Sequence, residues 1–89
     1  MLLKSMAETE IGVVSDYFAK VGVAAIKLSG SLKKGQTIHI TGNTTDLTQT
    51  AESLQINREN VEQANSGDEI GIKVHDRVRR NDKVFLVEE

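Results

Sequence analysis

The chain has 89 residues and a net charge of −2, which fits one small domain with a modest core. It contains no cysteine, and this excludes disulfide bonds, thiolate zinc sites and a cysteine nucleophile. The slightly acidic balance disfavours nucleic-acid binding by the whole surface but allows a local basic patch.

Short segments with alternating apolar side chains predict strands along the whole chain. The clearest segment carries Ala24, Ile26 and Leu28 at every second position, a period typical of a half-buried strand. The segment at residues 44–56 alternates poorly, so we expect a bulge or bend within it. Residues 61–64 form either a short strand or a bridging segment. In chain order, we expect strands at residues 11–14, 21–28, 36–41, 44–56, 69–75 and 83–87.

Glycine and asparagine separate these segments and predict tight turns. Gly42 and Asn43 turn the chain because both residues tolerate a positive φ, and Gly67 fits a turn in which no side chain is tolerated. Gly71 lies between two isoleucines, and its missing side chain lets another strand pass close by. A competing helix at residues 46–61 is disfavoured by threonines near its start, because β-branching restricts χ1 in helices. The pattern therefore indicates an all-β barrel or sandwich.

Two groups of short motifs occur in a fixed order. The first group comprises GxV at 12–14, VAAIKLSG at 23–30 and LKKGQTIHI at 32–40. The second group comprises AESLQI at 51–56, VEQA at 61–64, GDEIGI at 67–72 and NDKV at 81–84. Together they resemble domain two of elongation factor Tu and of initiation factor two, which are translation GTPases, over about residues 10–87.

The resemblance implies a small closed antiparallel β-barrel, like domain two of a translation factor, at residues 10–89. Residues 1–9 would then be an N-terminal extension. Asn81 replaces the family's usual glycine in the last turn, and asparagine adopts the left-handed conformation more readily than other side chains. The chain is also similar to the C-terminal domain attached to some U32-type peptidases, and most of all to stand-alone elongation-factor-like proteins.

Departures from the translation GTPases limit the function that this resemblance implies. No G-x-x-x-x-G-K-[S/T] phosphate loop is present, so we expect no bound nucleotide and no GTP hydrolysis. The family's pocket for the aminoacyl end of tRNA lies around the first hairpin, which here comprises residues 15–21. That segment does not match the pocket residues, so none is transferred to this chain.

A local excess of positive charge marks the segment between the last two predicted strands. We consider it a candidate RNA-backbone contact, through charge-assisted hydrogen bonds to phosphate. The alternative is a solvated loop with partly paired charges. Two lysines at an earlier turn would join the patch if the fold brings that turn alongside. The candidates are Lys73, Arg77, Arg79, Arg80 and Lys83, with Lys33 and Lys34 from the earlier turn.

The remaining candidate side chains are aromatic or carry an ionisable ring. Tyr17 and Phe18 are adjacent, so they point to opposite faces of a strand. We expect one in the core, and the other could stack on a base or anchor a protein partner. His39 and His75 fall on outward faces and make a poor metal site without cysteine ligands. Ser15 lacks a strained G-x-S-x-G elbow, so it is a poor nucleophile.

These observations predict a binding module with no catalytic residues, no metal and no cofactor. The first hypothesis is docking on RNA or ribonucleoprotein of the translation machinery, with rRNA or tRNA as partner. The alternative is a protein-interaction accessory domain that partners a U32-type peptidase and exposes an apolar patch. The absence of cysteine favours the cytoplasm, because small secreted domains often need disulfide bonds. No apolar run is long enough for a membrane span or a signal peptide, so we expect a cytoplasmic protein without a membrane partner.

Overall fold

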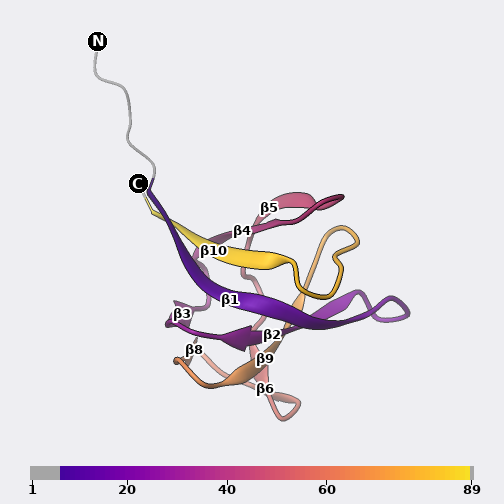
Figure 1. Cartoon of the computed structure of the whole chain (residues 1–89). Coiled ribbons are helices and arrows are strands. Elements are labelled where there is room, and N and C mark those ends of the chain that lie inside the picture. Colours follow the sequence, from indigo (N-terminus) through magenta and orange to yellow (C-terminus); the bar gives the residue numbers. More distant parts are fainter. Residues whose placement is uncertain (1–6, 89) are drawn as a thin grey trace.

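Ten strands and their turns make up the computed structural model, which describes residues 7–88 (Figure 1). No helix occurs in this range, so the described part of the chain has no helix that could cross a membrane. The competing helix at residues 46–61 is therefore absent. The strands are β1 (Ala7–Phe18), β2 (Val23–Leu28), β3 (Leu32–Lys33), β4 (Thr37–Thr41), β5 (Asp46–Thr50), β6 (Gln55–Ile56), β7 (Glu59–Asn60), β8 (Gln63–Ala64), β9 (Glu69–Lys73) and β10 (Lys83–Glu88).

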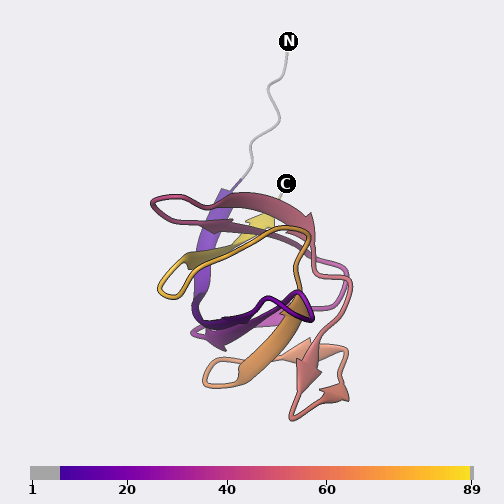
Figure 2. The ribbon, with the colours of Figure 1, turned by 90° about the vertical axis from the view of Figure 1, so that its right-hand side faces the viewer.

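Eight strands form one antiparallel sheet in the order β5-β4-β10-β1-β2-β9-β6-β7, and β3 pairs with β8 in a separate ladder. The eight-stranded sheet curls around a common interior (Figure 2). Alternate side chains fill that interior, as the sequence predicts: Ala24, Ile26 and Leu28 of β2 are at most 3% exposed. The all-β class is confirmed. The hydrogen-bonded strands follow one another in a linear order, with β5 at one end and β7 at the other.

The first strand is longer than predicted, because it begins at Ala7 and not at residue 11. Ala7 pairs with Glu88 of β10, so residues 7–9 of the expected N-terminal extension belong to the sheet, and residues 1–6 lie outside the described range. The register of β1 shifts between Glu10 and Gly12, and again on its other side between Val14 and Asp16. Such bulges bend a strand, which lets β1 curve between β10 and β2.

The predicted strand at residues 44–56 is interrupted, as the poor alternation suggested. β5 ends at Thr50, and Ala51 and Leu54 are buried in the connection to β6. The amide of Ala51 donates to Gln36 O at 2.8 Å, which anchors this bend to the start of β4. Of the two alternatives for residues 61–64, the short strand is present, because β8 pairs with β3.

Two of the predicted turn conformations are confirmed. Gly67 and Asn81 have φ values of 94° and 72°. The reason given for Gly42 and Asn43 is wrong, because neither has a positive φ. Gly42 is instead required by space, since a Cβ there would collide with the carboxylate of Asp82.

The close approach predicted at Gly71 is also absent. A Cβ at Gly71 would meet only Val23 Cγ1, at an ordinary contact distance of 3.5 Å. The tight position is Gly12, where a Cβ would lie 2.7 Å from Lys27 O of the neighbouring strand. Glycine thus allows β1 and β2 to approach at residue 12, whereas residue 71 has room for a side chain.

Gln49 joins the first strand of the sheet order to the end of β9. Its side chain is nearly buried, with 6% of the residue exposed. Nε2 donates to Lys73 O at 2.9 Å, and Oε1 accepts from the His75 amide at 2.8 Å. The carboxamide therefore acts as a backbone peptide would in a neighbouring strand.

His39 links three strands on the outer face of the sheet. Its Nδ1 lies 2.9 Å from Glu8 Oε1 of β1, and its Nε2 lies 2.6 Å from Asp46 Oδ1 of β5. Hydrogen bonding to Glu8, and then to Asp46, raises the pKa of His39 above its ordinary value of 6.5. The ring is more enclosed than the predicted outward position implies, since its side chain is 21% exposed.

Replacing Gln49 by Leu should lower the free energy of unfolding by about 2 kcal/mol, because the substitution leaves Lys73 O and the His75 amide without their partner. Urea denaturation measures the effect. Gln63→Leu is the matched control: within residues 7–88 its exposed amide bonds only the Asn65 side chain, at 3.2 Å, so a change below about 0.5 kcal/mol is expected. Equal effects of the two substitutions would contradict the role of Gln49.

The contribution of His39 to stability should disappear as the pH rises. A pKa raised by folding gives stabilisation that is complete below the unfolded pKa and is lost as pH rises through the folded pKa. We expect His39→Gln to lower the free energy of unfolding at about pH 6, where the carboxylates are ionised, and to have a smaller effect at about pH 9. Urea denaturation of both chains, each also carrying His75→Gln, isolates His39. A difference that does not vary with pH would contradict this prediction.

Candidate functional site

The predicted basic segment forms the loop between β9 and β10, and the buried Val78 anchors it to the core. This loop lies beside the turn between β4 and β5. Arg77 and Arg79 line one polar hollow with residues 44–47, and Arg79, Arg80 and Lys83 line the adjacent hollow with residues 41–44. The structure therefore brings these four cations together beside the turn between β4 and β5.

Lys73 lies apart from those four side chains. It ends β9 and lines a separate hollow with Glu52, Ser53 and His75. Its backbone amide donates to Ser53 Oγ at 3.2 Å, which ties this residue to the connection between β5 and β6. His75 Nε2 lies 3.0 Å from Glu52 Oε1, so this histidine belongs to the same hollow.

Carboxylates neutralise part of the basic loop. Arg80 Nη2 lies 3.4 Å from Asp16 Oδ2, and Lys83 Nζ lies 3.7 Å from Glu10 Oε1. The Tyr17 amide, and then Arg80, lower the pKa of Asp16. These pairs are solvent-exposed and contribute little to stability. They fit the predicted solvated loop with partly paired charges, and the RNA contact stays a prediction.

Lys33 and Lys34 do not join the loop. β3 follows the end of β2 at Leu28, which lies near Glu69, the start of β9. The basic loop leaves the other end of β9, where Lys73 pairs with Val23. Figure 1 shows β3 and the β9–β10 loop at opposite ends of the sheet. The condition for a single patch is therefore not met, because the strand register separates the two turns.

Tyr17 and Phe18 divide as predicted. Tyr17 packs against the hydrophobic core, whereas Phe18 is 50% exposed. Val21, in the turn after Phe18, is 59% exposed. They are the two large apolar side chains that are exposed within residues 7–88, and they lie close together at the β1–β2 turn.

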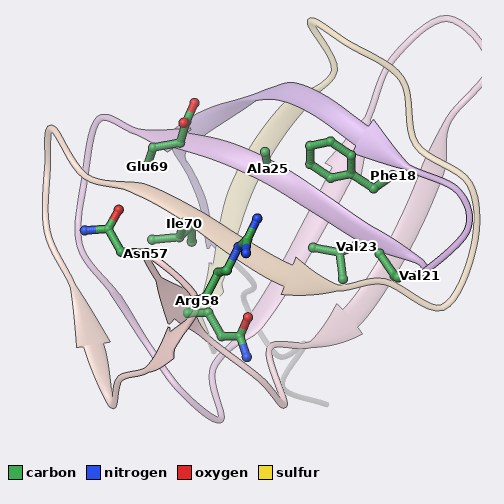
Figure 3. A pocket seen from close by; sticks show the side chains of 10 residues that line it. Phe18, Val21, Val23, Ala25, Asn57, Arg58, Glu69 and Ile70 are labelled. Atoms are coloured by element: carbon green, nitrogen blue, oxygen red, sulfur yellow. The ribbon is translucent and has the colours of Figure 1, made fainter.

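These two side chains border a groove that sequence reasoning did not find. The groove has a volume of about 600 Å³ and lies on the outer face of β2 and β9 (Figure 3). The β6–β7 hairpin supplies Asn57 and Arg58 to its rim, and β9 supplies Glu69. The available signal was the small residues at outward positions 25 and 71 of strands with large inward residues. The residues lining the groove are Phe18, Val21, Val23, Ala25, Gln55, Asn57, Arg58, Glu69, Ile70 and Gly71.

Ser15 is engaged in structural hydrogen bonds. Its Oγ contacts Ala25 O at 3.2 Å and Glu69 Oε2 at 3.0 Å. The side-chain partners of both histidines are carboxylates and not Ser15. Ser15 thus fixes the position of the Glu69 carboxylate at the rim of the groove.

Comparison with known proteins gives one group of relatives, although no family model matches the chain. An uncharacterized protease of Methanocaldococcus jannaschii is 43% identical over 81 residues, which cover 90% of this chain and 20% of that protein. A collagenase of Porphyromonas gingivalis is 36% identical over 84 residues, which cover 92% of this chain and 23% of that protein. The chain therefore spans about a fifth of the length of these relatives.

Solved structures show the same fold in a separate domain. Two crystal structures of the C-terminal domain of a Geobacillus thermoleovorans protein classed as a U32 peptidase have TM-scores of 0.81 and 0.82. They are 16% and 17% identical to this chain, of which they cover 85% and 90%, and the matches cover 96% and 92% of those domains. The predicted similarity to a U32 peptidase C-terminal domain is confirmed, whereas the resemblance to elongation factor Tu stays a prediction.

Proposed function

We propose that this chain is a non-catalytic accessory module that docks on a protein partner, a peptidase of the U32 type. The observation that carries this proposal is the likeness, in sequence and in fold, to a limited part of proteases. The matching Geobacillus domain was crystallised separately as a C-terminal domain, which supports a unit that folds by itself.

The side chains on the surface also favour binding over catalysis. Within residues 7–88, Ser15 Oγ bonds the Ala25 carbonyl and the exposed Glu69 carboxylate and no histidine, so the Ser-His-Asp arrangement of a serine nucleophile is not formed around it. The exposed Phe18 and Val21 supply the apolar patch that a protein-interaction module requires. A few residues, often aromatic, provide most of the affinity in protein interfaces.

We further infer that the curled sheet is a closed barrel, as the resemblance to domain two of translation factors implies. The bridge from Gln49 of β5 to the end of β9 supports this inference, because it connects strands that are far apart in the sheet order. Closure would protect the backbone of β5, which otherwise offers an edge for aggregation.

Docking on RNA is a second candidate function. It is favoured by the position of Arg77, Arg79, Arg80 and Lys83 around one turn. Within the described part of the chain Arg77 and Arg79 form no ion pair, so two of these cations are available for phosphate. The acidic partners of the other two reduce the positive potential of this surface.

Affinity capture from the source cell, with the tagged chain as bait, should recover a U32-type peptidase identified by mass spectrometry. Recovery should persist in about 0.5 M salt, because apolar contacts are not screened as charge contacts are. The Arg77→Ala/Arg79→Ala variant is the matched control and should recover the peptidase equally well. Absence of the peptidase from the recovered material would contradict the proposed function.

RNA docking predicts a steep dependence of affinity on salt, because bound phosphates release counterions. The Arg77→Ala/Arg79→Ala/Arg80→Ala variant should reduce the slope of log affinity against log salt by about 0.7 for each phosphate that it no longer binds. Filter binding to fragments of ribosomal RNA measures it. Lys33→Ala/Lys34→Ala removes charge at the other end of the sheet and should leave the slope unchanged. An unchanged slope for the arginine variant would reject the loop as an RNA site.

A further inference from the structure

The groove that Phe18 and Val21 border lacks large side chains at two facing positions of its floor. Ala25 of β2 pairs with Gly71 of β9, and Gly71 also pairs with Gln55 of β6. Ile70 and Ile72 point into the core, so residue 71 faces outward. A depression results on the outer surface of the sheet, where β2, β9 and β6 meet.

One wall of this depression is apolar and open to solvent. Phe18 pairs with Val23 across the β1–β2 hairpin, and Val21 follows in the turn. Phe18 and Val21 are at least half exposed. Figure 3 shows Phe18, Val21 and Val23 together on one side of the groove. An apolar side chain of a partner would cover this wall and remove it from water.

Arg58 occupies a backbone position that favours glycine. Asn57 and Arg58 form the two-residue turn between β6 and β7, with φ values of 52° and 67°. Asparagine followed by glycine is the usual pair in such a turn, because both residues are left-handed. An arginine here keeps a strained conformation, and strain of this kind concentrates at binding sites. Figure 3 shows the Arg58 side chain extending across the groove.

The charges of the groove have opposite signs at separate points of its rim. Arg58 forms no ion pair among the described residues, whereas Glu69 is held in place by Ser15 Oγ at 3.0 Å. A nucleic-acid backbone would place phosphates beside Glu69 and be repelled. An extended peptide can offer a carboxylate to Arg58 and place an apolar side chain two residues away on the same face.

We propose that this groove binds an extended segment of a protein partner that carries a large apolar residue two positions from an acidic one, so that both side chains point to the same face. The apolar side chain lies on Ala25 and Gly71 against Phe18, and the carboxylate pairs with Arg58. This assignment rests on the proposed function, because it names the chemistry by which the module would recognise its protein partner.

The test uses the purified, 15N-labelled chain and two blocked peptides that are identical except for a central Phe-Ser-Glu or Phe-Ser-Lys triplet; these are the Phe-Glu peptide and the Phe-Lys peptide. In NMR titrations, the Phe-Glu peptide should shift the amide signals of residues 18–25, 55–58 and 69–71. It should bind several-fold more tightly than the Phe-Lys peptide. The Arg58→Glu variant should reverse that order, since it reverses the charge at the rim.

A larger side chain at residue 71, in the floor of the groove, tests where the apolar side chain of the peptide lies. Gly71→Leu has room in the folded chain, because a Cβ there makes only an ordinary contact and residue 71 has no positive φ. It should weaken the Phe-Glu peptide at least tenfold, whereas Gly71→Ala should weaken it much less. Phe18→Ser, at a half-exposed position, is a second variant that should weaken binding without unfolding the chain.

Several results would overturn the inference. These are no peptide-induced shifts, equal affinity of Gly71→Leu and wild type, or the same peptide preference in Arg58→Glu. Signals of the groove that shift on dilution without peptide would assign the surface to a second copy of this chain. Undiminished capture of the peptidase by Gly71→Leu would reject the groove but keep the proposed function. Peptide binding without any captured peptidase would keep the groove but reject the proposed function.

Discussion

The curl of the sheet depends on the hydrogen bonds at the C-terminal end of β9. Lys73 O and the His75 amide are bound there by a side chain and not by a strand, since the Gln49 carboxamide meets both. The two hydrogen bonds of this buried side chain are directional, so they fix the distance between β5 and β9. The bulges of β1 provide the complementary bend on the opposite part of the sheet.

This constraint also positions the candidate sites. β9 pairs with β2 along its whole length and is fixed to β5 at its end, so residue 71 has a defined place between β2 and β6. The basic loop begins where the Gln49 bridge ends. Both surfaces are therefore built on the same strand, but one lies on its outer face and the other beyond its terminus. A partner at one of them need not cover the other.

Features that depend on neighbouring residues in the chain could be predicted from the sequence, whereas contacts between distant strands could not. Alternation identified the inward residues of β2, and turn chemistry identified Gly67, because these depend on neighbours in the chain. The left-handed Asn81 was expected from the family resemblance, in which a glycine stands at that position. The close approach assigned to Gly71 belongs to Gly12, since only the register shows which glycine faces a crowded carbonyl. The groove escaped prediction for the same reason: its walls come from three segments that meet only when β2, β9 and β6 pair.

Magnitudes favour the groove over the basic loop as the stronger contact. A phenylalanine buries about 150–250 Å², so covering the exposed half of Phe18 removes about 100 Å² from water. At about 25 cal/mol per Å², this contributes about 2.5 kcal/mol before the entropy of association is subtracted. An exposed ion pair contributes about 0–1 kcal/mol and weakens with salt, and two of the loop cations already have carboxylate partners. At physiological ionic strength, the apolar surface therefore offers more binding energy for each residue covered, and proteins, unlike nucleic-acid backbones, present the apolar side chains that can use it.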